Sequence, residues 1–145
     1  MTPPELAERL LAGLLLRDEG MLLQLLGADA RLTVDAGDGR GAETRGPARI
    51  AVALLARLGR PAGASLSIGA ANGGPAIVQR DADGTVTGVL CFEGEGAIDA
   101  LWLSTAPARL DHWNRRRSSQ IAEPSGLSLT TAAEPPAART ERQET

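Results

Sequence analysis

The sequence predicts an α+β fold in which a curved antiparallel sheet of five or six strands packs on three helices. Leucines with helical spacing dominate the first part of the chain, and short β-rich runs alternate with glycine turns from 72 to 103. Strands in meander order need a covering layer, which only the helical first half can supply. At 145 residues, the chain is long enough for one domain with a hydrophobic core.

The N-terminal segment is expected to form a helical hairpin. Thr2 and Glu5 form a capping box around Pro3 at the first helical position. Asp18 is placed to cap a second short helix over 21–26. The buried stripe of the first helix is expected to comprise Leu6, Leu10, Leu11, Leu14 and Leu15.

The next segment is expected to supply a strand over 31–35, an edge strand over 43–45 and a third helix that starts at Gly46-Pro47. Between the strands lies a glycine-rich polar loop, 35–41. This loop has neither phosphate-binding glycine pattern and lacks the spacing of a calcium loop, so we interpret it as a hairpin connection. The buried stripe of the third helix is Ile50, Ala51, Leu54, Leu55 and Leu58.

Glycine turns define the strands that follow. A strand ending at Ala71 meets Asn72-Gly73-Gly74, which offers the positive φ angles of a tight hairpin turn. The turn 81–84 precedes a strand over 86–92, and a last strand covers 98–103. These strands should form an antiparallel meander, followed by a helical turn over 108–114.

Composition limits the classes of function. The net charge of −3 argues against a nucleic-acid surface or a polybasic membrane patch. The single cysteine, Cys91, cannot form an intrachain disulfide and fits a reducing compartment. The apolar run 10–16 is too short to span a bilayer. The absence of lysine, together with the alanine and glycine content, suggests a GC-rich genome, and we expect a bacterial, cytoplasmic protein. A domain is expected over 1–114 and a disordered tail over 115–145.

The element order resembles the nuclear transport factor 2-like fold of ketosteroid isomerases and SnoaL-like polyketide cyclases. NGGPAIV followed by DGTVTGVLCFE and GAIDALWLSTAPARL is similar to the SnoaL-like C-terminal extension of certain extracytoplasmic-function sigma factors. DAGDGRG corresponds to that family's aspartate-glycine loop, and the resemblance covers roughly 5–113. The sequence departs from the family at its Asn-Pro-x-Lys-Leu ending, where Ala106 and Arg109 replace Asn and Lys.

The resemblance implies a stand-alone, non-catalytic module that regulates transcription by binding. We expect the chain to lack the promoter-binding domains of those sigma factors, because its sequence starts at the first helix of the extension. The expected partner is a sigma factor, another protein or a small apolar ligand, without direct contact to nucleic acid or membrane. A homodimer through the open sheet face is a further alternative. The candidate binding residues are Asp35, Asp38, Arg40, Asn72 and Trp102.

A small SnoaL-type isomerase, cyclase or hydrolase is the alternative, with a carboxylate or histidine as base inside the cone. The polar groups available are Asp35, Arg45, Asn72, Glu93, Asp99 and His112, with Trp102 as a wall. Glu93 is a buried base if its face of the strand lines the cone, and a solvated carboxylate if Leu90 and Phe92 line it. His112 is either a base or a residue of the terminal helical turn. One His and one Cys make no metal site, and no cofactor is expected.

Overall fold

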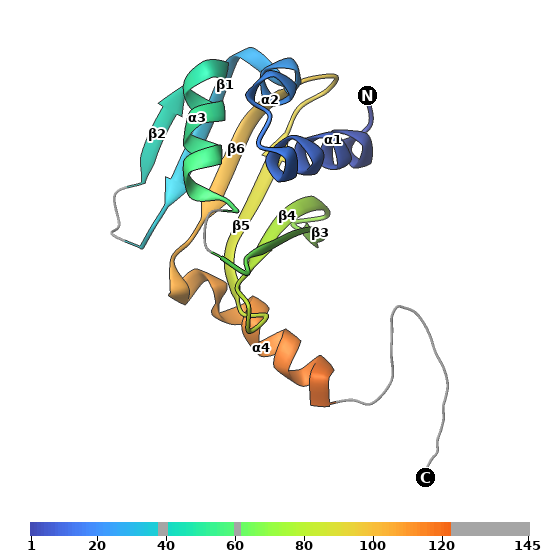
Figure 1. The fold of residues 1–145 in the computed structure, drawn as a ribbon, viewed down its shortest axis with the longest axis vertical. Coiled ribbons are helices and arrows are strands. Elements are labelled where there is room, and N and C mark those ends of the chain that lie inside the picture. Colours follow the sequence, from blue (N-terminus) through green and yellow to red (C-terminus); the bar gives the residue numbers. More distant parts are fainter. Residues whose placement is uncertain (38–40, 60–61, 123–145) are drawn as a thin grey trace. The chain divides into compact units, whose positions relative to one another are not determined.

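The computed structural model describes residues 1–37, 41–59 and 62–122. The chain divides into two compact units, 1–111 and 112–145. The first unit contains one curved sheet of six strands in the order β2-β1-β6-β5-β4-β3 (Figure 1). The strands are β1 Leu26–Asp35, β2 Ala42–Arg45, β3 Ser65–Ala71, β4 Gly74–Arg80, β5 Val86–Glu93 and β6 Ile98–Ser104.

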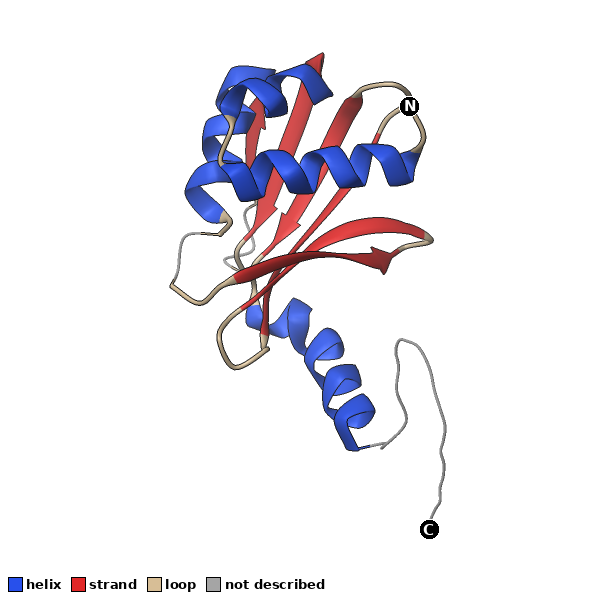
Figure 2. Ribbon diagram, turned by 45° about the vertical axis from the view of Figure 1, so that its right-hand side comes forward, coloured by secondary structure: helices blue, strands red, loops and turns tan. Residues whose placement is uncertain are grey.

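Three helices cover one face of this sheet (Figure 2). They are α1 Pro3–Leu16, α2 Glu19–Leu25 and α3 Pro47–Arg57. The predicted α+β class, a cone-shaped sheet packed on helices, is confirmed. Within residues 1–37, 41–59 and 62–122, no helix combines the length and the apolar character needed to cross a bilayer.

A fourth helix, α4, spans Pro107–Ala122 and therefore runs from the first unit into the second. The sequence predicts only a helical turn over 108–114 in this place. The helix is longer because neither glycine nor proline interrupts the sequence until Pro124. The remainder of the predicted tail, 123–145, lies outside the described residues.

The predicted caps of the first two helices are confirmed. The Thr2 hydroxyl accepts a hydrogen bond from the backbone N–H of Glu5 at 3.3 Å, and the Glu5 carboxylate accepts one from the N–H of Thr2 at 2.7 Å. The hydrogen bonds from Thr2, backbone first and then side chain, lower the pKa of Glu5. Asp18 accepts a hydrogen bond from the N–H of Met21 at 3.2 Å and is the N-cap of α2, as predicted. The helix itself spans Glu19–Leu25 rather than 21–26, because it begins directly after its cap and Leu26 already belongs to β1.

One strand pairing differs from the prediction. We expect an antiparallel sheet from the sequence, but β1 and β6 run parallel, with Leu32 opposite Leu101 and Val34 opposite Leu103. The turns in the sequence define only the pairing of strands that follow one another directly. Because β1 and β6 are separated by β2, α3 and the whole meander, no turn motif reports their direction. The sheet is therefore mixed.

Alternate residues of the strands point toward the helices and form an aliphatic core. Twelve large side chains in the first unit are less than 2 % exposed: Leu6, Leu10, Leu14, Leu22, Leu32, Ile50, Leu54, Leu58, Ile77, Leu90, Ile98 and Leu101. Each such side chain contributes about 1.5–3 kcal/mol through burial. Leu15, predicted to be buried, is 57 % exposed, because the α1 stripe runs along Leu6, Leu10 and Leu14 at i, i+4 spacing.

Candidate functional site

A cleft of about 800 Å³ opens at the end of the sheet where β3 turns into β4 and β5 leads into β6. Its volume lies within the range of about 300–1,000 Å³ that is typical of ligand clefts. The start of α1 forms one side of it. The lining residues are Pro3, Leu6, Ala71, Asn72, Gly73, Gly74, Pro75, Cys91, Phe92, Glu93, Gly94, Glu95, Asp99, Ala100 and Trp102. We call this feature the turn cleft.

The Asn72-Gly73 turn forms one wall of the turn cleft. Both residues have positive φ, 53° for Asn72 and 80° for Gly73, and Ala71 pairs with Gly74 across the two-residue loop. Two successive positive φ angles characterise the type I′ turn that best matches the twist of a hairpin. The predicted hairpin turn is confirmed, and it holds the exposed Asn72 at the cleft.

The register of β5 and β6 places Trp102 in the turn cleft. Trp102 lies opposite Cys91, which in turn lies opposite Ala76 of β4. These residues belong to the sheet face that points away from the helices. Trp102 is 42 % exposed there and does not line the interior of the cone.

The same alternation settles the position of Glu93. Leu90 is buried among the helices and Phe92 packs against that core, so Glu93 points to the other side of β5. Glu93 is an exposed carboxylate beside the turn cleft, and the solvated alternative holds. Asp99 on β6 is exposed as well.

Cys91 is a free, half-buried thiol in the turn cleft. Burial raises its pKa, which keeps the thiol protonated at neutral pH and makes it a poor nucleophile. In the part of the chain that the structure describes, no group of three His, Cys, Asp or Glu side chains is arranged to hold a metal ion.

Asp35 lies at the end of β1, where β6 also ends, away from the Asn72 turn. Its carboxylate is 3.3 Å from the Arg109 guanidinium and accepts a hydrogen bond from the N–H of Gly37 at 3.0 Å. Its carbonyl oxygen accepts a hydrogen bond from Thr105 at 3.0 Å. The start of the aspartate-glycine loop therefore packs against the segment that carries Arg109. Asp38 and Arg40 lie outside the described residues.

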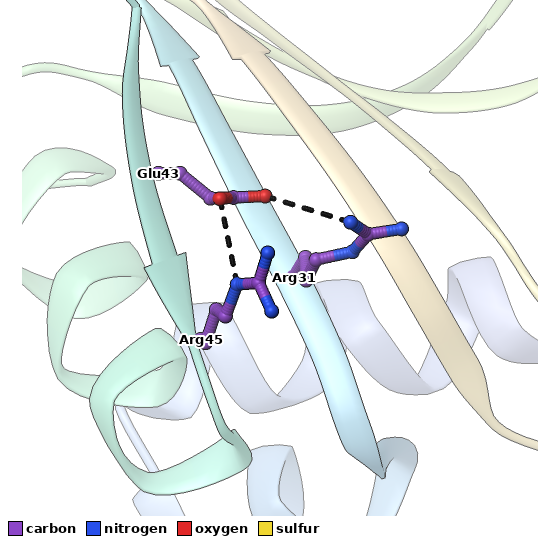
Figure 3. Close-up of polar contacts among 3 residues, drawn as sticks. All are labelled: Arg31, Glu43 and Arg45. Carbon is purple, nitrogen blue, oxygen red and sulfur yellow. Dashed lines mark hydrogen bonds and ion pairs between the residues drawn. The ribbon is translucent and has the colours of Figure 1, made fainter.

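The remaining candidates are His112 and Arg45. His112 is exposed on α4 and belongs to the second unit. Arg45 lies on the edge strand β2, where Glu43 is 3.4 Å from it and 3.8 Å from Arg31 (Figure 3). The side chains of these three residues are 43–70 % exposed, so each ion pair contributes at most about 1 kcal/mol.

Of the predicted site residues, the structure brings Asn72, Glu93, Asp99 and Trp102 together at the turn cleft. The sequence-based prediction missed Gly74 and Glu95, which line the same cleft. It also missed the contribution of α1, because nothing in the spacing of residues 3 and 6 relates them to residues 72–102. Only the topology brings these segments to one end of the sheet.

No family model matches the chain, and no curated protein matches it. Solved structures do. An NTF2-like protein of unknown function from Mesorhizobium loti aligns with a TM-score of 0.56 at 18 % identity, over 70 % of this chain and 88 % of that one. The chain therefore has the nuclear transport factor 2-like fold, the fold class that the sequence predicts.

Two further structures share this fold. The extracytoplasmic function sigma factor SigJ of Mycobacterium tuberculosis aligns with a TM-score of 0.56 at 18 % identity, over 75 % of this chain and 44 % of SigJ. A candidate ketosteroid isomerase from Kribbella flavida aligns with a TM-score of 0.50 at 17 % identity, over 69 % of this chain and 74 % of that one. The same fold thus occurs in a regulator of transcription and in a protein named as an enzyme, so function must be argued from the site.

Proposed function

We propose that the chain is a non-catalytic, SnoaL-like binding module with a regulatory role, related to the C-terminal extension of extracytoplasmic-function sigma factors. The observation that carries the proposal is the turn cleft, where an exposed indole, the Asn72 turn and apolar side chains meet at one end of the sheet. Its occupant is a segment of a partner protein or a small apolar ligand.

The interior of the cone supports this proposal. Enzymes of the resembled families work with a polar group inside the cone, but here aliphatic side chains fill the space between sheet and helices. Among the described residues, the buried polar side chain is Gln79. Its oxygen accepts a hydrogen bond from the N–H of Gly59, and its amide donates one to the Thr87 hydroxyl at 3.1 Å. The side chain of Gln79 therefore has a structural role.

The turn cleft has rigid, partly exposed apolar side chains, which favour binding of a ligand or a partner protein. Trp102 and Phe92 are rigid side chains with large apolar surfaces, and tryptophan is enriched among residues that dominate binding energy. Pro75 and the Asn72 turn hold the adjacent backbone in one conformation. A preformed apolar surface of this kind binds a partner at a low entropic cost.

The proposal is tested with Nile red, a neutral dye whose fluorescence rises in apolar surroundings. We expect saturable binding to the full chain, lost in Trp102→Ala and in Gly74→Val. Val52→Ala is the matched control, because Val52 is an exposed apolar side chain on α3, outside the cleft. Equal binding by Trp102→Ala and the unmodified chain would contradict the proposal.

The regulatory relation rests on different support, namely the NGGPA and DAGDGRG motifs and the fold shared with SigJ. It is tested by mixing the purified chain with the purified promoter-binding domains of an extracytoplasmic-function sigma factor and measuring binding by calorimetry. We expect association that Asn72→Ala weakens. The same preparation, examined alone by sedimentation velocity, shows whether the chain forms the homodimer expected from its open sheet face.

An enzyme of the SnoaL type is the alternative function, because Glu93 lies beside Trp102 in the turn cleft and the fold is shared with a candidate ketosteroid isomerase. An exposed carboxylate could act as a general base toward a ligand bound there. Isomerisation of a ketosteroid by the full chain, abolished in Glu93→Gln, would establish the enzyme and refute the non-catalytic proposal. We expect no turnover.

A further inference from the structure

The charge of the turn cleft has one sign. Its lining includes the carboxylates of Glu93, Glu95 and Asp99, and no arginine is among the described residues that line it. Glu93 ends β5, Glu95 lies in the loop between β5 and β6, and Asp99 belongs to β6. All three are exposed, and we call them the rim carboxylates; the apolar residues of the cleft include Pro75, Phe92 and Trp102. A cleft lined by charges of one sign raises the local concentration of ligands of the opposite sign.

Trp102 adds a second feature that favours a cationic ligand. Its side chain is partly exposed in the same cleft as the three carboxylates. The face of an indole ring attracts a cation, and the planar guanidinium of arginine stacks on it while pairing with a carboxylate. Lysine, as a strongly hydrated point charge, fits this combination less well.

Gly74 leaves the cleft open where the fold does not require a glycine. Gly73 needs its positive φ of 80°, whereas Gly74 is not among the residues with positive φ. A Cβ added at Gly74 would meet no atom within 4 Å. Glycine in a strand is destabilising relative to alanine, so local stability favours a side chain here. The missing side chain gives a ligand close access to the backbone of the turn.

We propose that the turn cleft binds an arginine-bearing peptide segment of a partner protein. The guanidinium stacks on Trp102 and pairs with the rim carboxylates, while the peptide backbone lies over Gly74. The proposal rests on the binding function proposed above and names its ligand class. Residues 123–145 of this chain are a poorer occupant, because they carry Glu123, Glu134, Glu141 and Glu144 against only Arg139 and Arg142.

The test uses Trp102 as the reporter, in the full chain with Trp113→Phe so that a single tryptophan remains. The probe is acetyl-tetraarginine amide, titrated at low and at physiological salt. We expect a saturable change in Trp102 fluorescence and at least a tenfold lower affinity in the double variant Glu93→Gln/Glu95→Gln. Gly74→Val should weaken binding to a similar extent while the far-ultraviolet circular dichroism stays unchanged.

Three controls make the result decisive. The tetracitrulline peptide has the same shape without charge and should not bind. Spermidine, a small polyamine, should bind at least tenfold more weakly than the arginine peptide. The double variant Glu19→Gln/Asp29→Asn removes two charges outside the cleft and should bind like the unmodified chain.

Each contrary result overturns the proposal. Equal binding of the citrulline peptide would show that the cleft does not recognise the guanidinium charge. Equal binding of spermidine would show that a small cation is the ligand. An equal loss in Glu19→Gln/Asp29→Asn would show that the net charge alone attracts the peptide. If Nile red binds the turn cleft but the arginine peptide does not, the binding function stands and its assignment to an arginine-bearing segment is wrong.

Discussion

The two sides of strand β6 differ in what they can do. Leu101 and Leu103 point toward the helices and are fully buried in an aliphatic core, whereas Trp102 between them is 42 % exposed in the turn cleft. The core side holds the sheet and helices together. The cleft side leaves apolar surface in water and gathers three carboxylates near it. The proposed binding face of β6 is therefore opposite the face that packs in the core.

The nuclear transport factor 2-like fold does not by itself define what the chain does. A nuclear transport factor 2-like cone carries catalysis only if its interior contains the groups that do chemistry. Here leucine and isoleucine side chains dominate the core between sheet and helices, and the carboxylates of the turn cleft are exposed. Substitutions on the two faces test whether one face contributes mainly to stability and the other mainly to binding.

The largest expected effect comes from substituting neighbours on β6. Leu101→Ala should lower the free energy of unfolding by about 2–5 kcal/mol, because it empties space in a packed core. Trp102→Ala should lower it by no more than about 1 kcal/mol, as is usual for exposed sites, while abolishing Nile red binding. Urea unfolding of both variants checks this. A larger loss of stability in Trp102→Ala than in Leu101→Ala would contradict the claim that the helix-facing side of β6 contributes more to stability than the cleft side.

Gln79→Ala should be the next most destabilising substitution. It removes the acceptor for the N–H of Gly59 and the partner of the Thr87 hydroxyl, and a buried group left without its partner costs about 1–3 kcal/mol. Nile red binding should be unchanged, because Gln79 does not line the cleft. Thermal unfolding and dye titration of the same variant test both halves. A loss of dye binding in a folded Gln79→Ala variant would show that the interior takes part in binding.

Arg109→Ala should have a smaller effect on stability, at most about 1 kcal/mol, because the Arg109 side chain is 71 % exposed and its ion pair with Asp35 is screened by solvent. Thr105→Ala keeps the backbone hydrogen bond to Asp35 and serves as the control. Chemical denaturation in low and high salt measures the effect. A loss well above 1 kcal/mol would mean that the aspartate-glycine loop is part of the structural core.

The smallest expected effect concerns the Cys91 thiol. Burial raises its pKa in the folded chain, so the folded state holds the thiol proton more tightly than the unfolded state does. The free energy of unfolding should therefore fall slightly as the pH rises above the ordinary thiol pKa, and less so in Cys91→Ala. Denaturation midpoints at neutral and alkaline pH make the comparison. An identical pH dependence in the two proteins would show that folding does not raise the pKa of the Cys91 thiol.

Much of the fold could be predicted because its signals are local. Thr2, Asp18 and Asn72 each specify a cap or a turn through their own side chain or their immediate neighbours. The parallel pairing of β1 with β6 could not be predicted, because it depends on segments some seventy positions apart in the sequence. Only part of the candidate site was predictable, for the same reason.

The predictable part consists of single exposed residues in recognisable motifs, such as Asn72 and Trp102. Gly74 and Glu95 give no signal of their own, and the contribution of α1 depends on how the helix crosses the sheet. Strand alternation left two positions open for Glu93. The choice between them depended on which face of β5 the helices cover, and that is a property of the tertiary structure.

The most direct test of the central claim is a map of where an apolar ligand binds. Benzyl alcohol, a small neutral probe, is titrated into the isotope-labelled full chain, and the backbone amide shifts are followed by heteronuclear NMR. We expect shifts confined to residues 72–75, 91–95 and 99–102, around the turn cleft. Shifts centred on Leu10, Leu14 and Leu54, with the cleft residues unaffected, would place the binding site inside the cone and contradict it.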